Sequence, residues 1–181
     1  MDNIKEIEYK GLEQIAALMC VAARTAPKSK GIDTLVSVLL TSEEKSRLIE
    51  EMKRIGDKED IDIFLRDAKC VEQSNQVLVM GLRTQRIGIK NCGMCGYKNC
   101  SDNQKNNGLC VFNVIDLGIA IGSSVNTASF LHADNRIMYT VGKAALNLKL
   151  LGEEVRLAFG IPLSCSSKNP FFDRVFERNK S

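Results

Sequence analysis

Four of the seven cysteines stand close together in the sequence, at Cys92, Cys95, Cys100 and Cys110. Two residues separate the first pair, four separate the next pair, and nine precede the last cysteine. A spacing of two lets one turn present two thiolates to the same metal, and four thiolates are the ligand set of iron-sulfur clusters and of structural zinc. The sequence therefore predicts one metal centre, with a 4Fe-4S cluster as the first expectation and zinc as the alternative.

The residues between these cysteines suit such a centre. Gly93 and Gly96 directly follow the first two cysteines, where missing side chains allow the backbone to fold tightly around a metal and to direct amides at sulfur. The stretch SDNQKNNGL before the last cysteine is polar and turn-forming except for its final residue, so it can loop back. We expect residues 91–110 to be a four-cysteine segment inserted into a single domain that spans residues 1–181.

Apolar residues at three- and four-residue spacings predict the helices, and short runs of branched apolar residues predict buried strands. The expected helices are residues 12–24, a helix that starts at a capping box of Thr41 and Glu44 and ends near Gly56, a helix capped by Asp60, and residues 113–131 and 135–151. The expected strands are residues 34–40, 76–82 and 154–163. Because helices and strands alternate, we expect a layered α+β structure.

The last two expected helices contain glycines, at Gly118, Gly122 and Gly142. Each glycine would weaken an isolated helix by roughly 1 kcal/mol relative to alanine. We therefore interpret these positions as places where another helix or a cofactor approaches closely.

The composition argues against several classes of protein. A net charge of +3 is too small for a surface that binds nucleic acid, and no stretch of about 18 uninterrupted apolar residues could span a bilayer. The sequence also begins without an apolar export signal, and seven cysteines in such a chain indicate metal binding or catalysis rather than disulfides. We expect a cytoplasmic protein with no nucleic-acid or membrane partner.

The cysteine segment resembles a known type of cluster-binding domain. CGMCGYKNC is similar to the opening of the four-cysteine 4Fe-4S domains of corrinoid iron-sulfur proteins and of membrane electron-transport subunits. From residue 91 to residue 174, with DLGIAIGSS, DNRIMYTVGKAAL and GIPLSCSSKNPFFDR, the chain resembles a family of uncharacterised prokaryotic proteins described as containing a ferredoxin domain. This resemblance implies an iron-sulfur cluster and leaves the reaction open.

The remainder of the chain resembles the FMN-dependent nitroreductases. The resemblance rests on the order of a helix, an APKSKG loop, a buried strand and a capped helix, together with the later helix pair and the GIPL turn. The resemblance implies a mixed sheet packed with helices, a homodimer, and FMN whose phosphate is held by basic side chains and free amides. The residues that it nominates for FMN are Arg24, Lys28, Ser29, Lys168 and Arg174, with Lys30 in the same loop. Without a phosphate, the same side chains are a solvated basic loop and a surface tail.

Two functions are consistent with these patterns. In the first, the protein is an oxidoreductase or electron-transfer protein whose cluster exchanges single electrons with a redox partner protein, a small-molecule substrate or FMN. In the second, it is a non-enzymatic binding or regulatory protein, and zinc only stabilises the fold of the cysteine segment.

Overall fold

The computed structural model describes residues 3–172 of the protein. Helices and strands alternate along the chain, so the α+β fold class is confirmed. The helices are α1 (Ile4–Thr25), α2 (Ser42–Glu59), α3 (Asp62–Gln73), α4 (Cys100–Lys105), α5 (Val111–Phe130) and α6 (Tyr139–Asn147), with a short 3-10 turn, η1 (Ser29–Gly31), after α1. The strands are β1 (Leu35–Leu39), β2 (Gln76–Arg83), β3 (Asp134–Asn135) and β4 (Val155–Ser164). Of these elements, η1, α4 and β3 were not predicted.

The strands of the described residues form one sheet in the order β1-β2-β4-β3, and every neighbouring pair is antiparallel. The prediction of a mixed sheet is therefore wrong. The physical reason is that two helices, α2 and α3, connect β1 to β2 and return the chain to the end of the sheet where β1 stopped. Leu40 N, just after β1, donates to Val77 O near the start of β2 (3.0 Å). The chain re-enters the sheet at this point and runs back beside β1.

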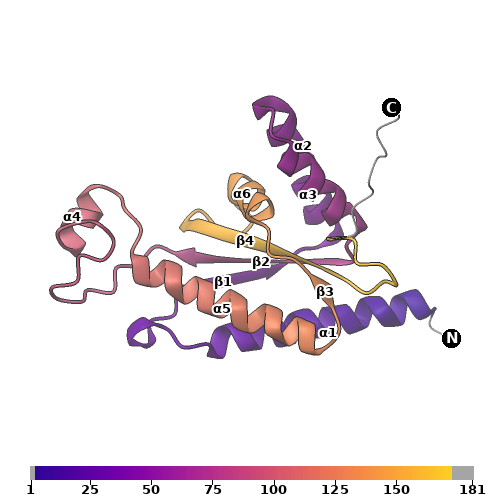
Figure 1. The fold of residues 1–181 in the computed structure, drawn as a ribbon, viewed down its shortest axis with the longest axis horizontal. Coiled ribbons are helices and arrows are strands. Elements are labelled where there is room, and N and C mark those ends of the chain that lie inside the picture. Colours follow the sequence, from indigo (N-terminus) through magenta and orange to yellow (C-terminus); the bar gives the residue numbers. More distant parts are fainter. Residues whose placement is uncertain (1–2, 173–181) are drawn as a thin grey trace, which may run out of the picture.

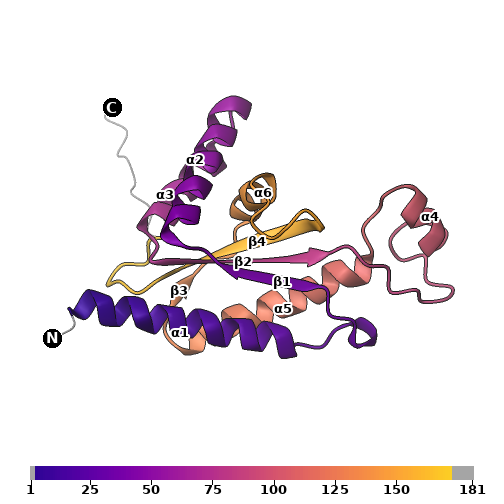
Figure 2. The ribbon, with the colours of Figure 1, turned by 180° about the vertical axis from the view of Figure 1, so that it is seen from behind.

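Helices cover both faces of the sheet, with α1 and α5 on one face and α2, α3 and α6 on the other (Figure 1, Figure 2). The central strand β2 contributes side chains to both cores in alternation. Leu78, Met80 and Leu82 pack with α1 and α5, whereas Val77 and Val79 pack with the other three helices. Burial on both faces explains why β2 is a continuous apolar run rather than an alternating one.

The ends of the helices depart from the sequence predictions in several places. The capping box is confirmed, because Glu44 N donates to Thr41 Oγ1 (3.2 Å) and Thr41 N donates to Glu44 Oε2 (2.8 Å). However, α2 continues past Gly56 to Glu59, and Asp60 ends it with a left-handed φ of 53°. Asp60 therefore caps the end of α2 and does not cap the start of α3. Gly56 instead makes room for a neighbouring helix, since a Cβ there would lie 2.7 Å from Leu65 Cδ2.

Helix α1 begins at Ile4 rather than at residue 12, and Asn3 caps it by accepting from Lys5 N (3.3 Å). The added turns carry Ile4 and Ile7, which are 64% and 52% exposed. Ile4 and Ile7 stand eight residues before Leu12 and Ile15, a helical spacing that the prediction did not use.

The three helical glycines have different surroundings. Gly118 and Gly122 lie on the exposed side of α5, and nothing within this chain lies within 4 Å of a Cβ built on either. The interpretation of close approach is therefore wrong for these two within one chain. For Gly142 it is right, but the approaching group is the backbone of β4 at Ala158 rather than a helix or a cofactor.

Among the described residues, α5 is the one helix whose length and composition would allow it to cross a membrane. In its most apolar 18-residue window, 39% of the residues are buried inside the chain. Leu117, Ala120 and Ile121 are buried in the core that α5 shares with α1 and β2. The central helix of a folded domain meets the same criteria of length and composition, and these contacts assign α5 to the core.

Candidate metal centre

The chain between β2 and α5 carries the four cysteines and projects from one end of the layers (Figure 1). Cys92, Cys95, Cys100 and Cys110 all line one open cavity of about 290 Å³, together with their neighbours in residues 88–101 and Val111. Cys110 is buried, and the other three thiols are half-buried. The fold thus brings the four sequence-predicted ligands around a common space. Whether the segment is an inserted unit stays a prediction.

The backbone between the first cysteines turns tightly. Gly93 and Gly96 have φ values of 62° and 82°, and Gly96 N donates to Gly93 O (3.0 Å). Glycine adopts this left-handed region at little cost, whereas a Cβ is penalised there. The tight backbone predicted at these glycines is confirmed. The turn places Met94 at the surface, where it is 65% exposed.

Asn103 connects one of the cysteines to an arginine. It lies in α4 and is 1% exposed. Its Nδ2 donates to Cys95 Sγ (3.4 Å) and to Leu109 O (2.9 Å), and its Oδ1 accepts from Arg86 Nε (2.9 Å). Arg86 also donates to Gly108 O (3.3 Å). These bonds join α4 to the bend that leads into the fourth cysteine.

Sequence analysis missed both Arg86 and Asn103. Asn103 had a usable signal, because it follows Cys100 by three residues and residues at that spacing share one side of a helix. Arg86 had none, since it lies 17 residues before Asn103 and only the folded chain brings them together.

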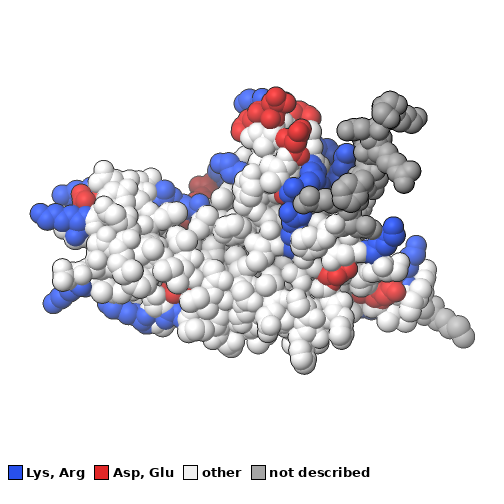
Figure 3. Space-filling model, in the orientation of Figure 1, with Lys and Arg blue, Asp and Glu red and all other residues white. Residues whose placement is uncertain are grey.

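The surroundings of the cavity are basic. Residues 83–110 contain one acidic residue, Asp102, and the exposed cations among them are Arg83, Lys90, Lys98 and Lys105. Figure 3 shows Lys and Arg side chains gathered at the end of the molecule that carries α4. Lys30 of η1 adds a further cation, because its Nζ donates to Ile87 O (3.2 Å) and Gly88 O (3.3 Å). Lys30 therefore anchors the start of the cysteine segment.

Four thiolates suit either a cluster or a single zinc ion, and the cavity has room for either group. Four thiolates at about 2.3 Å from one zinc bring their sulfur atoms to about 3.8 Å from one another. Within residues 3–172, no three Cys, His, Asp or Glu side chains converge closely enough to hold one ion. The cavity of about 290 Å³ is roughly twenty times the 10–15 Å³ that one water molecule needs. A metal centre of either kind stays a prediction.

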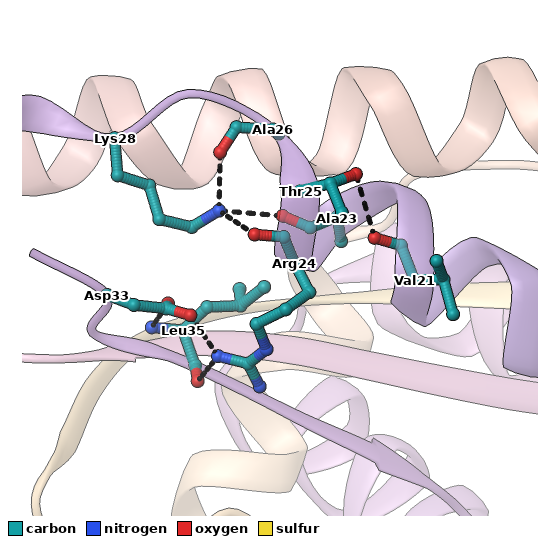
Figure 4. A network of polar contacts seen from close by, with 8 residues as sticks. All are labelled: Val21, Ala23, Arg24, Thr25, Ala26, Lys28, Asp33 and Leu35. Carbon is teal, nitrogen blue, oxygen red and sulfur yellow. Dashed lines mark hydrogen bonds and ion pairs between the residues drawn. The ribbon is translucent and has the colours of Figure 1, made fainter. Parts of the chain in front are cut away.

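The basic loop predicted to hold a flavin phosphate makes bonds within its own chain (Figure 4). Lys28 Nζ donates to Ala23 O, Arg24 O and Ala26 O at 2.7–2.9 Å, which uses all three ammonium donors to cap α1. Arg24 pairs with Asp33 and donates to Leu35 O (3.2 Å). Burial alone would raise the pKa of Asp33, but hydrogen bonds and charge from Arg24 outweigh burial and lower it.

Ser29 is engaged as well, by an acidic side chain that sequence analysis missed. Its N–H and hydroxyl donate to the carboxylate of Asp116 at 2.9–3.1 Å. Asp116 is 6% exposed and lies in the first turns of α5. A carboxylate of this chain therefore occupies the amide and hydroxyl that a phosphate was predicted to use. The usable signal was a lone acidic residue in an otherwise uncharged helix.

Lys168 lies far from this loop within one chain. Arg83 N donates to Thr34 O at the end of β2 near the basic loop (3.0 Å), whereas Cys165 N donates to Asn75 Oδ1 just before β2 begins (3.4 Å). At about 3.3 Å per residue, the two ends of β2 are roughly 23 Å apart. The structure does not bring Lys168 together with Arg24, Lys28 and Ser29 in one chain. Arg174 lies outside the described residues.

Of the three cysteines outside the segment, Cys70 is buried, and Cys20 and Cys165 are partly exposed. Burial raises the pKa of Cys20, Cys70 and Cys165, and the carboxylate of Glu8 raises that of Cys165 further. A raised pKa keeps a thiol protonated and unreactive at neutral pH. These residues serve as controls for the four clustered cysteines.

The arrangement of helices and strands is similar to that of several solved proteins. Nitroreductase A from Vibrio parahaemolyticus RIMD 2210633 aligns with 86% of this chain and 60% of its own, at 14% identity and a TM-score of 0.55. A BluB-like flavoprotein from Clostridium difficile 630 aligns with 86% of this chain and 81% of its own, at 16% identity and a TM-score of 0.56. NADPH:FMN oxidoreductase from Vibrio harveyi, complexed with NAD+, aligns with 90% of this chain and 63% of its own, at 14% identity and a TM-score of 0.54.

These likenesses show that the chain has a nitroreductase-like fold, although it spans about three fifths of the length of the first of these proteins. Residues 106–174 match the family described as "uncharacterized protein containing a ferredoxin domain". A relative from Archaeoglobus fulgidus, described as an uncharacterized protein, is 38% identical over 96% of this chain and 97% of its own. The chain belongs to this family of ferredoxin-domain proteins. The matched residues include Cys110 and leave out the other three clustered cysteines.

Proposed function

We propose that the protein is an iron-sulfur oxidoreductase or electron-transfer protein in which the four clustered cysteines hold a 4Fe-4S cluster. The observation that carries this proposal is the single cavity of about 290 Å³ that all four thiols line. The family description, which names a ferredoxin domain, supports it. The alternative is a binding or regulatory protein with a structural zinc. A zinc site requires the four sulfur atoms to approach one another to about 3.8 Å.

A bound cluster supplies the transfer of single electrons. The residues of this chain supply the thiolates, and Asn103 supplies a donor to one of them. Three of the four thiols are half-exposed, and Met94 lies exposed between two of them, so a redox partner can approach this end of the molecule. A cluster does not select a substrate, and that selection belongs to the rest of the fold.

Flavin binding fits this chain poorly as a single copy. Lys28 and Ser29 are bonded within the chain, and Lys168 lies at the opposite end of β2. The similar protein from Vibrio harveyi is an NADPH:FMN oxidoreductase, and FMN in this chain stays a prediction from the fold alone. The function proposed here routes no step through a flavin.

The basic surroundings of the cysteines favour an acidic partner. Cations around a redox centre attract a partner of opposite charge and speed the encounter. We propose an acidic redox protein or an anionic small molecule as the partner, in the cytoplasm, where thiols stay reduced. All seven cysteines are unpaired, as that setting requires. Nucleic acid and a membrane form no part of this proposal.

We further propose that a second copy of this chain covers the outer face of α5. Val114, Ile115 and Ile119 are 37–43% exposed on this face, and Gly118 and Gly122 lie open beside them. Asp116, which is buried, is the only charged residue of α5, and Figure 3 shows this face without charge. In a two-fold dimer the same patch of each copy packs on the other. This patch suits such an interface, because it carries no charge and its glycines have no side chains to hold the two copies apart.

Replacing Ile119 with glutamate should therefore separate a dimer into monomers. The added carboxylate would be desolvated at the centre of an apolar contact. The free-energy cost of that desolvation exceeds the free energy that the apolar contact contributes to association. Light scattering coupled to size exclusion should give twice 20.0 kDa for the wild type and 20.0 kDa for the variant. Arg47→Glu, on the exposed surface of α2, is the matched control and should stay dimeric. A wild-type protein that elutes as a monomer at about 100 μM would contradict the proposed dimer.

Protein purified without oxygen should contain about four iron and four sulfide per chain. Each of Cys92→Ser, Cys95→Ser and Cys100→Ser should lose most of both, because a hydroxyl is a poor substitute for a thiolate ligand. Cys165→Ser, which changes a thiol outside the cavity, should keep both. Metal analysis and acid-labile sulfide measure the outcome, and one tightly bound zinc without sulfide would establish the alternative function.

A further inference from the structure

We propose that Arg86 and Asn103 form a hydrogen-bonded relay that raises the reduction potential of the cluster through Cys95. The inference rests on the proposed function, because a potential exists only where a cluster is bound. It assigns two positioning residues that lie outside the four-cysteine motif.

The orientation of the Asn103 amide is fixed by its partners. Arg86 can only donate, so the atom that faces it must be the acceptor Oδ1. Leu109 O can only accept, so Nδ2 must face it, and the same Nδ2 then points to Cys95 Sγ. A flipped amide would lose both contacts. The guanidinium of Arg86 therefore decides that Cys95 receives an N–H group.

Gly108 leaves room for the Asn103 amide. A Cβ at Gly108 would lie 2.7 Å from Asn103 Nδ2 and 2.5 Å from Tyr97 Cε2. The Gly108 carbonyl also accepts from Arg86 (3.3 Å). The bend at Gly108 thus leaves room for the amide and ties the arginine to the segment.

The relay changes the potential for an electrostatic reason. Reduction adds negative charge to a cluster and its sulfur ligands, and a hydrogen bond to a ligand sulfur stabilises the reduced state more than the oxidised state. A cation that holds the other end of the amide polarises the N–H group and strengthens its bond to sulfur. Loss of either residue should therefore lower the potential.

Arg156 offers a matched control for charge alone. It lies on β4, and its guanidinium donates to Asn107 O (2.9 Å) and Asn107 Oδ1 (2.8 Å) in the same segment. Replacing either arginine with glutamine removes one positive charge that contacts the segment. Only Arg86 is joined to a cysteine sulfur through Asn103.

The experiment is a redox titration that is monitored by electron paramagnetic resonance. The proteins compared are the wild type, Asn103→Asp, Arg86→Gln and Arg156→Gln, and iron and sulfide are measured on each. Asn103→Asp keeps the shape of the side chain, removes the N–H group and adds a negative charge. Both changes lower the potential, so the two arginine variants test the relay without an added negative charge. We expect Asn103→Asp to lower the equilibrium constant for reduction about tenfold, which is 59 mV for a one-electron couple. Arg86→Gln should lower that constant about threefold or more, and Arg156→Gln less than twofold.

Unchanged potentials in Asn103→Asp and Arg86→Gln, with full iron and sulfide, would overturn the relay and leave the proposed function intact. Equal shifts in Arg86→Gln and Arg156→Gln would also overturn it, because charge alone would then explain both. If Asn103→Asp loses its cluster, the comparison of the two arginine variants still decides the question. A wild-type protein without iron and sulfide overturns the proposed function, and the relay with it.

Discussion

Replacing Gly142 with alanine should destabilise the protein by about 3 kcal/mol or more, one of the largest effects expected of a single methyl group. Gly142 lies in α6 where that helix crosses β4. A Cβ there would lie 2.7 Å from Phe159 N and closer still to Ala158 O, both of which are backbone atoms. A side chain could rotate away from such a clash, but a strand at the centre of a sheet cannot.

The junction between α6 and β4 has little freedom to relax. Met138 N donates to Gly160 O (2.8 Å) and Gly160 N donates to Met138 O (2.9 Å), which fixes the start of α6 to the strand. Val141 packs directly over Gly160, where a Cβ would overlap its side chain. The helix therefore cannot move outward at Gly142 without breaking these contacts.

Thermal unfolding measures the effect, and a loss of about 3 kcal/mol should lower the melting temperature by roughly 6–12 °C. Gly11→Ala is the matched control, because Gly11 is also in a helix and a Cβ there meets nothing within 4 Å. It should be neutral or should stabilise the protein by up to about 1 kcal/mol. Equal melting temperatures for the two variants would contradict the close packing of α6 on β4.

Removal of the metal should unfold the cysteine segment and leave the layered domain folded. Ordering the backbone costs roughly 1–2 kcal/mol per residue. From residue 91 to residue 110, Cys110 is the one hydrophobic residue that is buried, so little apolar area offsets this cost without a metal. By contrast, β2 is buried on both faces, and α5 packs against α1.

Hydrogen exchange on metal-loaded and metal-free protein tests this expectation. Amides from about residue 91 to residue 110 should exchange at least about a hundredfold faster without metal, as in locally unfolded segments. Amides of β2, β4 and α5 should keep their protection. Residues 87–88, just before the cysteine segment, should respond less than the segment itself, because Lys30 still holds Ile87 O and Gly88 O. If β2 and α5 lost protection as well, the metal would be a requirement of the whole fold.

Much of the architecture is a local property of the sequence. The Thr41 and Glu44 capping box, the apolar spacing of α5 and the branched runs of β1, β2 and β4 all predicted elements that the structure contains. The four cysteines likewise carried their chemistry in their spacing, and the fold places them around one cavity. Side-chain periodicity and turn chemistry act between residues a few positions apart, so one sequence reveals them.

Several features that the sequence did not predict depend on contacts between distant residues. The antiparallel pairing of β1 with β2 depends on how α2 and α3 return the chain, and the close packing of Gly142 depends on a strand that follows it. Asp116 meets Ser29 across 87 positions, and Asn103 meets Arg86 across 17. The sequence by itself determined which groups could bind a metal. Only the tertiary structure decided which neighbours those groups have, because hydrogen bonds between distant residues form only once the layers have packed.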